Sequence, residues 1–253
     1  MNKAININAK DRFARLLATE NIDVIHDSKA ETASFNTASR VLRLPRWKEM
    51  SGQLYDMLVA HEVGHALYTP NRIEDVTEIA DRHGVDPMVA KDYVNVVEDA
   101  RIERLMKQKF PGLRRDFISA YNDLMNREFF GDLSGINDMA FIDRINLHYK
   151  AGTIGMNVRF DEDENRIINT IDESETWEDV LDIVDTLLVD AAKKVKEQEQ
   201  EQGNQGLKGD PGDEDDDSET PESEPTDDDA TDSSESDSSE STEQSDETPD
   251  IKS

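Results

Sequence analysis

The sequence predicts an α+β, mainly helical protein with a small antiparallel sheet and a disordered acidic C-terminal tail. Three observations indicate this class. Much of the chain before residue 203 has apolar residues three or four positions apart, the spacing of a helix. Residues 31–44 instead form two strand-like segments around a turn. Residues 203–253 have almost no apolar side chains, so burial cannot offset the entropy cost of ordering them.

The N-terminal part is expected to contain a short helix followed by the sheet. Residues 10–20 have apolar side chains at helical spacing. Residues 31–36 and 40–44 flank a three-residue turn, and the second strand ends at Pro45. Because so short a turn returns the chain beside itself, the two strands are predicted to pair as an antiparallel hairpin.

Two strong helices are predicted in the middle of the chain. The first begins near Ser51 and ends at Thr69, because the following proline disfavours a further helical turn. The second begins at Asp86, an N-cap residue followed by proline at the first helical position, and ends at about Phe110. Residues 82–84, between these helices, are expected in a loop.

Further helices are expected over residues 113–129, 138–150 and 175–201. The last of these has an apolar stripe along one side, which predicts that it packs against other elements. No internal repeat is present.

Three parts are predicted along the chain. Residues 1–155 form the metal-binding domain, residues 156–202 are a helical extension packing on it or projecting from it, and residues 203–253 are the disordered tail. The tail has 20 acidic residues and 2 lysines, so it accounts for −18 of the formal net charge of −30. The preceding residues are therefore moderately acidic.

The charge, the apolar content and the lack of cysteine limit the partners and the compartment that are expected. An acidic body lacks the clustered Lys and Arg that phosphate contacts need, so no nucleic acid is expected. The tail is interpreted as a solvated extension, with an arm for a basic partner as the sharper alternative. No apolar run has the length of a membrane span or signal peptide. Together with the absence of cysteine, this favours a cytoplasmic protein.

Residues 61–65 have the sequence His-Glu-Val-Gly-His, which is typical of a zinc site. On a helix, His61 and His65 lie one above the other on one face, so both imidazoles can reach one ion. Glu62 is placed to act as general base on water at the metal. Gly64 is expected to leave room beside the ion. The alternative is a pair of structural histidines on a core helix.

A catalytic zinc usually has three protein ligands, and residues just after the motif do not supply the third. The metzincin pattern has glycine three residues and histidine six residues after the second motif histidine. This chain has Tyr68 and Asn71 at those positions. The third ligand must therefore come from another element.

The second strong helix offers two acidic candidates. Glu98 has apolar neighbours four residues before and after it, and a carboxylate on such a stripe is costly to bury unless it is paired or binds a metal. Glu98 is therefore the preferred third ligand. Asp99, on a polar edge, is assigned to orienting a histidine through its other ring nitrogen, or is the ligand itself. The alternative is a solvated face paired with Arg101 and Arg104.

Residues 45–69, 95–103 and 110–112 together resemble a group of zincin-like proteins. The group includes the metal-motif region of cobaltochelatase-type subunits and of nitric-oxide-reductase activation proteins. Stand-alone peptidase-like proteins of large tailed phages are similar. A phage origin would place the protein in the host cytoplasm. The von Willebrand A domain of the larger relatives is not expected, because too few residues lie between Gly112 and the acidic tail and residues 113–202 contain no Asp-x-Ser-x-Ser metal loop.

The resemblance implies a zincin-like metallopeptidase domain. It implies a zinc ion held by His61, His65 and an acidic third ligand, carried here by Glu98, with Glu62 as the base. Because no von Willebrand A domain is expected, the partner role of the larger relatives is not carried over.

Other polar residues are weaker candidates. Tyr149, with its neighbour His148, is the preferred donor to the oxyanion that forms during amide hydrolysis, although a structural aromatic is the more common role. Arg101 is an alternative donor. His83 is an alternative ligand, and His26 is interpreted as an ordinary loop histidine.

The favoured hypothesis is a zinc-dependent peptidase that hydrolyses a protein or peptide substrate by water activated at the metal. The strand at residues 40–44 is expected to be an edge with which an extended peptide pairs. The alternative function is a non-hydrolytic adaptor with a structural metal, whose acidic tail recruits a partner.

Overall fold

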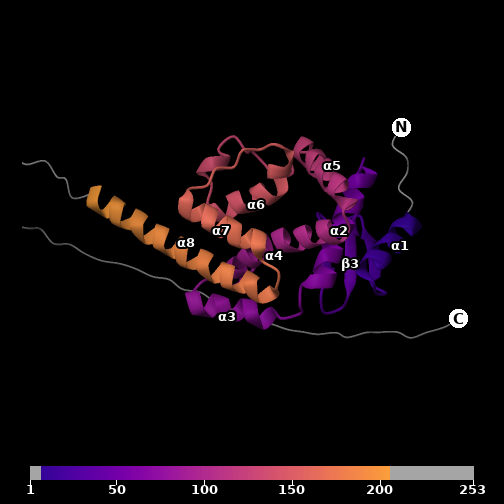
Figure 1. The fold of residues 1–253 in the computed structure, drawn as a ribbon, viewed down its shortest axis with the longest axis horizontal. Coiled ribbons are helices and arrows are strands. Elements are labelled where there is room, and N and C mark those ends of the chain that lie inside the picture. The colour runs from indigo at the N-terminus through magenta and orange to yellow at the C-terminus, as the bar shows by residue number, and fades with distance from the viewer. Residues whose placement is uncertain (1–6, 206–253) are drawn as a thin grey trace, which may run out of the picture. The chain divides into compact units, whose positions relative to one another are not determined.

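The computed structural model describes residues 7–205 (Figure 1). In this part of the chain, helices predominate and three strands form one sheet. The predicted mainly helical α+β class is therefore confirmed for these residues. In chain order, the elements are α1 (Ile7–Ala18), β1 (Asp23–Asp27), β2 (Ser34–Asn36), β3 (Val41–Pro45), α2 (Gly52–Tyr68), α3 (Ile73–His83), α4 (Pro87–Lys109), α5 (Leu113–Asn126), the 3-10 helix η1 (Ile136–Asp138), α6 (Phe141–Ala151), the 3-10 helix η2 (Gly152–Ile154), α7 (Glu162–Glu173) and α8 (Trp177–Gln205).

The sheet is mixed, so the prediction of a purely antiparallel sheet is wrong. Its order is β1-β3-β2, with β2 antiparallel and β1 parallel to the central strand. The predicted hairpin is present, since Phe35 of β2 pairs with Leu42 of β3. On its other side, Leu42 pairs with Val24 of β1. A parallel partner is joined by a long connection and leaves no turn signal in the sequence, so β1 is not predicted.

Helix α2 matches its predicted bounds because both ends have local signals. The hydroxyl of Ser51 accepts a hydrogen bond from the backbone N–H of Leu54 at 3.0 Å, which is the N-cap arrangement. At the other end, the backbone N–H of Thr69 donates to the carbonyl of His65 at 3.0 Å. Much of the helix is buried, so it forms part of the core.

Helix α4 also begins as predicted. The segment before it was predicted as a loop but is helical up to His83. The carboxylate of Asp86 accepts from the backbone N–H of Met88 at 2.7 Å. Residues 82 and 83, expected in a loop, form the last turn of α3, which ends at Gly84 with φ of 64°. The N-cap residue of α3, Arg72, makes no side-chain capping bond, so the sequence carries no capping signal for the start of this helix.

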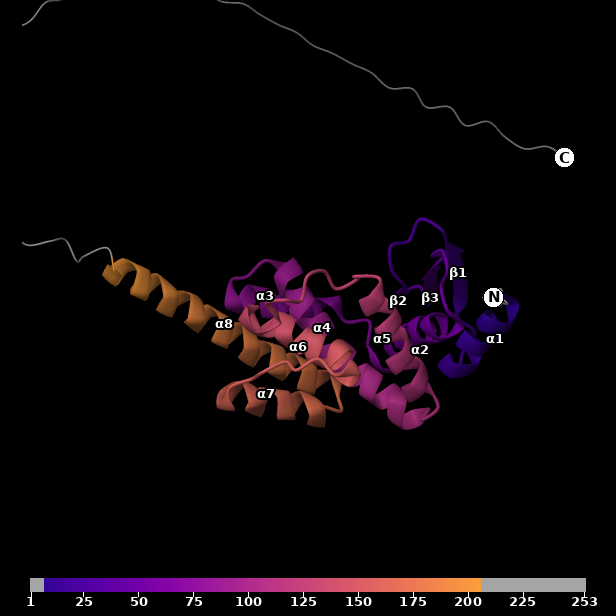
Figure 2. The same cartoon turned by 90° about the horizontal axis from the view of Figure 1, so that it is seen from above.

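Two groups of buried apolar side chains meet at α4. The first includes residues of α1, the sheet, α2 and α5, together with Met106 of α4. The second includes residues of α3, α6, α7 and α8, together with Val94 and Val97 of α4. Figure 2 shows α4 among these helices, with the sheet and α1 on the side of α2. The histidine-bearing helix therefore contacts α4 where the two groups join.

Residues 156–202, expected as a helical extension, contain α7 and most of α8, and both helices contact α4. Helix α7 is absent from the helices predicted above. Its start nevertheless has a capping box, in which Asp161 and Glu164 bond each other's backbone N–H. An Asp followed three residues later by Glu is a recognisable start signal, so this helix was accessible from the sequence.

No helix among the described residues is long and apolar enough to cross a membrane. The predicted disordered tail, residues 203–253, lies outside the described residues except for 203–205, which belong to α8.

Candidate metal centre

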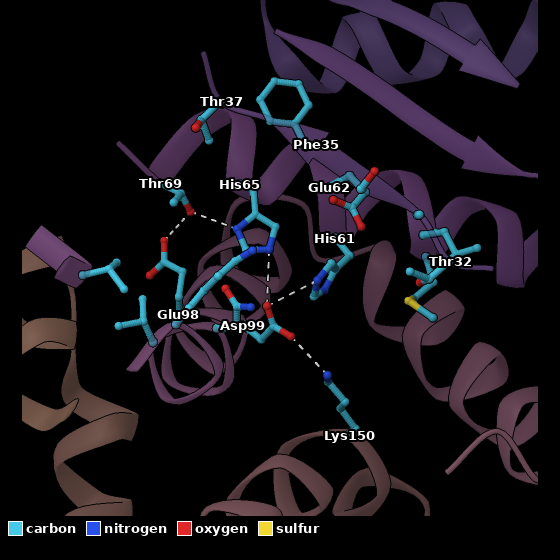
Figure 3. A pocket seen from close by; sticks show the side chains of 18 of the residues that line it. Thr32, Phe35, Thr37, His61, Glu62, His65, Thr69, Glu98, Asp99 and Lys150 are labelled. Atoms are coloured by element: carbon cyan, nitrogen blue, oxygen red, sulfur yellow. Dashed lines mark hydrogen bonds and ion pairs between the residues drawn. The ribbon is translucent and has the colours of Figure 1, made fainter. Parts of the chain in front are cut away.

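Three side chains from α2 and α4 converge on one point (Figure 3). His61 and His65 lie one helical turn apart, with ring centroids separated by 5.1 Å. Oδ1 of Asp99 lies 3.4 Å from Nε2 of His61 and 3.3 Å from Nε2 of His65. Each residue offers one ligand atom, and these atoms all lie within 4.8 Å of one another.

This arrangement fits a zinc ion in chemistry and in size. Two imidazole nitrogens and one carboxylate oxygen form a common donor set for catalytic zinc, which bonds them at about 2.0–2.2 Å. Ligands arranged as a tetrahedron around such an ion lie roughly 3.4 Å apart. The measured distances from Asp99 to both histidines match this spacing. With three protein ligands, a fourth position remains for water or substrate.

Each histidine is oriented through its other ring nitrogen. Nδ1 of His61 lies 3.1 Å from Oε1 of Glu103, and Nδ1 of His65 lies 3.0 Å from Oγ1 of Thr69. The Thr69 hydroxyl in turn donates to Glu98. With Nδ1 donating to these oxygens, Nε2 of both rings is left as an acceptor for an ion.

Glu98, the preferred ligand from the sequence, does not join the histidine nitrogens. Its carboxylate is buried and accepts two hydrogen bonds of 2.7 Å from the guanidinium of Arg101. The expectation of a buried carboxylate needing a partner is met, but the partner is an arginine. The structure instead brings Asp99, the alternative ligand, to the histidines.

The pair of Glu98 and Arg101 gives a prediction about stability. Replacing Glu98 by glutamine leaves the buried guanidinium of Arg101 without its counter-charge, and breaking such a pair costs about 3–5 kcal/mol of unfolding free energy. Arg101 is also held by the carbonyls of Tyr68 at 3.0 Å and Glu175 at 2.7 Å, so we expect the lower end of this range. Urea unfolding monitored by circular dichroism measures the loss.

The matched control is Glu162→Gln on α7, where an exposed glutamate pairs with Arg166. Exposed pairs contribute about 0–1 kcal/mol. Equal shifts in the two variants would contradict the structural role of Glu98.

Neighbouring charges stabilise the charged forms of Asp99 and His61. Burial opposes the charge of Asp99, but the imidazole of His61 and the ammonium of Lys150 outweigh this and hold the pKa of Asp99 well below its usual value. Burial likewise opposes charge on His61, but the carboxylates of Asp99 and Glu103 raise its pKa well above normal, so an ion binding at Nε2 must displace a proton from this ring. Asp99 is therefore a carboxylate near neutral pH, as a metal ligand must be.

Glu62 lies beside the histidines on α2 and is buried. Burial raises its pKa, and the neighbouring His61 and His65 and a hydrogen bond with the backbone of Phe35 partly oppose this rise. A carboxylate with a raised pKa is a stronger base than an exposed one. Glu62 therefore has the environment of a general base.

These side chains line an open cavity of about 590 Å³. Residues 32–35, the last two of which belong to strand β2, form part of its wall. Trp47 and Phe129 add aromatic surface. The other lining residues relevant to the site are His61, Glu62, His65, Thr69, Asn95, Glu98, Asp99, Tyr121 and Lys150. The cavity has the size of a small-molecule or short-peptide site.

Tyr149 and His148, the expected oxyanion donors, lie elsewhere. They line a second cavity, and the Tyr149 hydroxyl donates to the carbonyl of Ile168 at 3.2 Å and to Asp172 at 3.1 Å. The next residue, Lys150, is the one that reaches the candidate metal centre, where its ammonium donates to Oδ2 of Asp99 at 3.1 Å. One residue along a helix rotates the side chain by about 100°.

The remaining predicted candidates are also placed away from the donor cluster. Arg101, the alternative oxyanion donor, is bound to Glu98. His83, the alternative ligand, pairs with Asp185 at 2.8 Å. His26 lies on β1, not in a loop, and pairs with Asp11 at 2.8 Å.

Gly64 has a different role from the expected one. A Cβ atom at this position would lie 3.1 Å from Cδ1 of Ile102 and 3.2 Å from Cγ of Met106. The space at Gly64 is therefore taken up by the close packing of α2 against α4, and a larger residue would require Ile102 and Met106 to shift.

Glu103 is a functional candidate that sequence reasoning missed. It lies four residues after Asp99 on the same face of α4, and this spacing was the available signal. Its carboxylate is buried, accepts from the Tyr121 hydroxyl and lies 2.9 Å from the ammonium of Lys107. These contacts hold its pKa at about 2 despite burial, so it faces His61 as a carboxylate.

If the candidate centre holds zinc, replacing Glu103 by glutamine is expected to weaken its binding about 10- to 100-fold, because the imidazole of His61 loses its anionic partner. Competition with a fluorescent zinc chelator measures the affinity. The control is Asp92→Asn, an exposed acid on the same helix. Unchanged affinity in Glu103→Gln would show that this contact does not support the site.

Searches against protein-family models, curated proteins and solved structures found no match for this chain.

Proposed function

We propose that this protein is a zinc-dependent peptidase whose ion is held by His61, His65 and Asp99. The observation that supports this most strongly is the convergence of their three donor atoms beside the buried Glu62, in an open cavity. A structural zinc is normally closed by four protein ligands, whereas three ligands and an adjacent base are typical of hydrolytic sites.

When bound, zinc would lower the pKa of a water molecule that it holds and would polarise the substrate carbonyl. Glu62 accepts the proton of the attacking water and delivers it to the nitrogen of the leaving amine. Lys150 engages Oδ2 of Asp99, so Oδ1 is the oxygen of this carboxylate that would hold the ion together with His61 and His65.

The substrate proposed is an extended peptide segment. β3 is the central strand, so the expectation that residues 40–44 form a sheet edge is wrong. The edge on the cavity side is β2, and Ser34 and Phe35 line the cavity. A peptide lying along β2 can form backbone hydrogen bonds with it while its amide group reaches the metal centre.

Metal loading and removal test the function. The full-length protein is analysed for bound metal by mass spectrometry, loaded with one equivalent of zinc and incubated with a peptide library. Cleavage that disappears with a chelator and returns with zinc supports the proposal. Zinc bound at these residues without cleavage of any peptide would favour the non-hydrolytic adaptor instead.

A further inference from the structure

A second open cavity, of about 470 Å³, is lined by side chains of α4, α5, α6 and α7. None of the proposed zinc ligands lines it. Its lining residues are Ala100, Glu103, Arg104, Lys107, Gln108, Arg114, Phe117, Ile118, His148, Tyr149, Gly152 and Asp172. The volume is that of a site for a small organic molecule.

The cavity is cationic in a strongly acidic protein. Three cations line it, namely Arg104, Lys107 and Arg114, against the two acids Glu103 and Asp172. Both acids already have hydrogen-bonding partners within the chain. With a formal net charge of −30 overall, a lining with excess positive charge provides a local attraction for anions.

Arg104 has donor capacity that the described residues do not use. One terminal nitrogen, Nη2, donates to the carbonyl of Ser174. Its Nε is buried and has no hydrogen-bond partner in the described part of the chain. A buried donor without a partner costs about 1–3 kcal/mol, so an acceptor near this guanidinium would be stabilising.

Apolar side chains complete the lining. Phe117 lies under the ammonium of Lys107, with 4.5 Å between nitrogen and ring centroid, and Ile118 is 45% exposed. His148 is kept neutral by burial, which lowers its pKa. The cavity therefore offers positive charge for an anionic group and apolar surface for the rest of a ligand.

We propose that this cavity binds a small organic anion, an apolar body with one phosphate or carboxylate group. The anionic group contacts Arg104 and Arg114, since guanidinium groups form paired hydrogen bonds with both oxyacids. The apolar body lies against Ile118 and the ring of Tyr149, which also lines the cavity. Binding at this cavity needs no metal, so it does not depend on the proposed peptidase function.

Titration calorimetry on metal-free, full-length protein tests the site. Phenyl phosphate and phenylacetate are the two anionic probes, and benzyl alcohol is the neutral analogue of similar size. Saturable binding of at least one anion with a stoichiometry of one, together with no detectable binding of benzyl alcohol, is expected. The stronger of the two anions identifies the oxyacid. Absence of binding by both anions at millimolar concentration would overturn the proposal.

Matched variants locate the binding. Arg114→Met removes a cation of the cavity, whereas Arg115→Met removes its exposed neighbour on α5, which does not line the cavity. Loss of one charged hydrogen-bonding partner is expected to weaken binding about tenfold or more in Arg114→Met, with Arg115→Met unchanged. Arg104→Met provides the second test. Wild-type affinity in both cavity variants would place the anion elsewhere and overturn the proposal.

Discussion

Replacing Glu62 by glutamine is expected to reduce peptide hydrolysis about 10²- to 10⁴-fold while zinc content stays at the wild-type level. The amide of glutamine has nearly the shape of the carboxylate but cannot accept the proton of the attacking water, and general-base catalysis contributes a factor of this size. Glu62 is buried beside His61 but is not among the converging donor atoms. Initial rates with the best library peptide, together with bound-metal analysis, measure both quantities.

The control is Asp56→Asn, on the same helix but outside the cavity, where the carboxylate pairs with Lys10. This variant should cleave at the wild-type rate. Equal cleavage by wild-type protein and Glu62→Gln would contradict the proposed mechanism. Equal zinc content with lost cleavage would show that Glu62 acts as a base and not as a metal ligand.

Replacing Asp99 by alanine is expected to weaken zinc binding by at least about a hundredfold. Even residues that only orient a metal ligand contribute about 10- to 100-fold to affinity, and the loss of a direct ligand should be larger. Asp99 is the acid whose oxygen lies within 3.4 Å of both histidine nitrogens. Chelator competition at fixed pH measures the zinc affinity.

The informative comparison is Glu98→Ala, which removes the neighbouring acid. Glu98 reaches His65 only through Thr69, so we expect a smaller loss of zinc affinity than in Asp99→Ala, after correction for the unfolded fraction. The reverse order would restore Glu98 as the ligand and reject the assignment to Asp99.

The helices that carry the site were predictable because their signals are local. Ser51 and Asp86 cap the helices that begin after them, and each needs only neighbouring backbone groups to do so. β1 depends on a distant strand instead, and α3 begins without a side-chain cap. These elements depend on tertiary packing that no short window of sequence records.

The motif on α2 could also be recognised from the sequence, whereas the third proposed ligand could not be identified from it. Adjacent residues on a helix point about 100° apart, so the exact rotation of α4 decides which acid faces His61 and His65. Arg101, three residues after Glu98, was a local sign that Glu98 has another partner. The same rotation separates Tyr149, which faces the second cavity, from Lys150, which contacts Asp99.

The close approach of α2 and α4 at Gly64 has a consequence for how the proposed zinc ion would bind. Buried apolar residues of α2 pack with Met106 of α4 in one core, so we expect packing, and not the proposed ion, to bring the donor groups together. Small zinc-finger domains, in contrast, are unfolded without their metal. We therefore expect the proposed zinc to bind to an already folded domain and to be removable without loss of the fold.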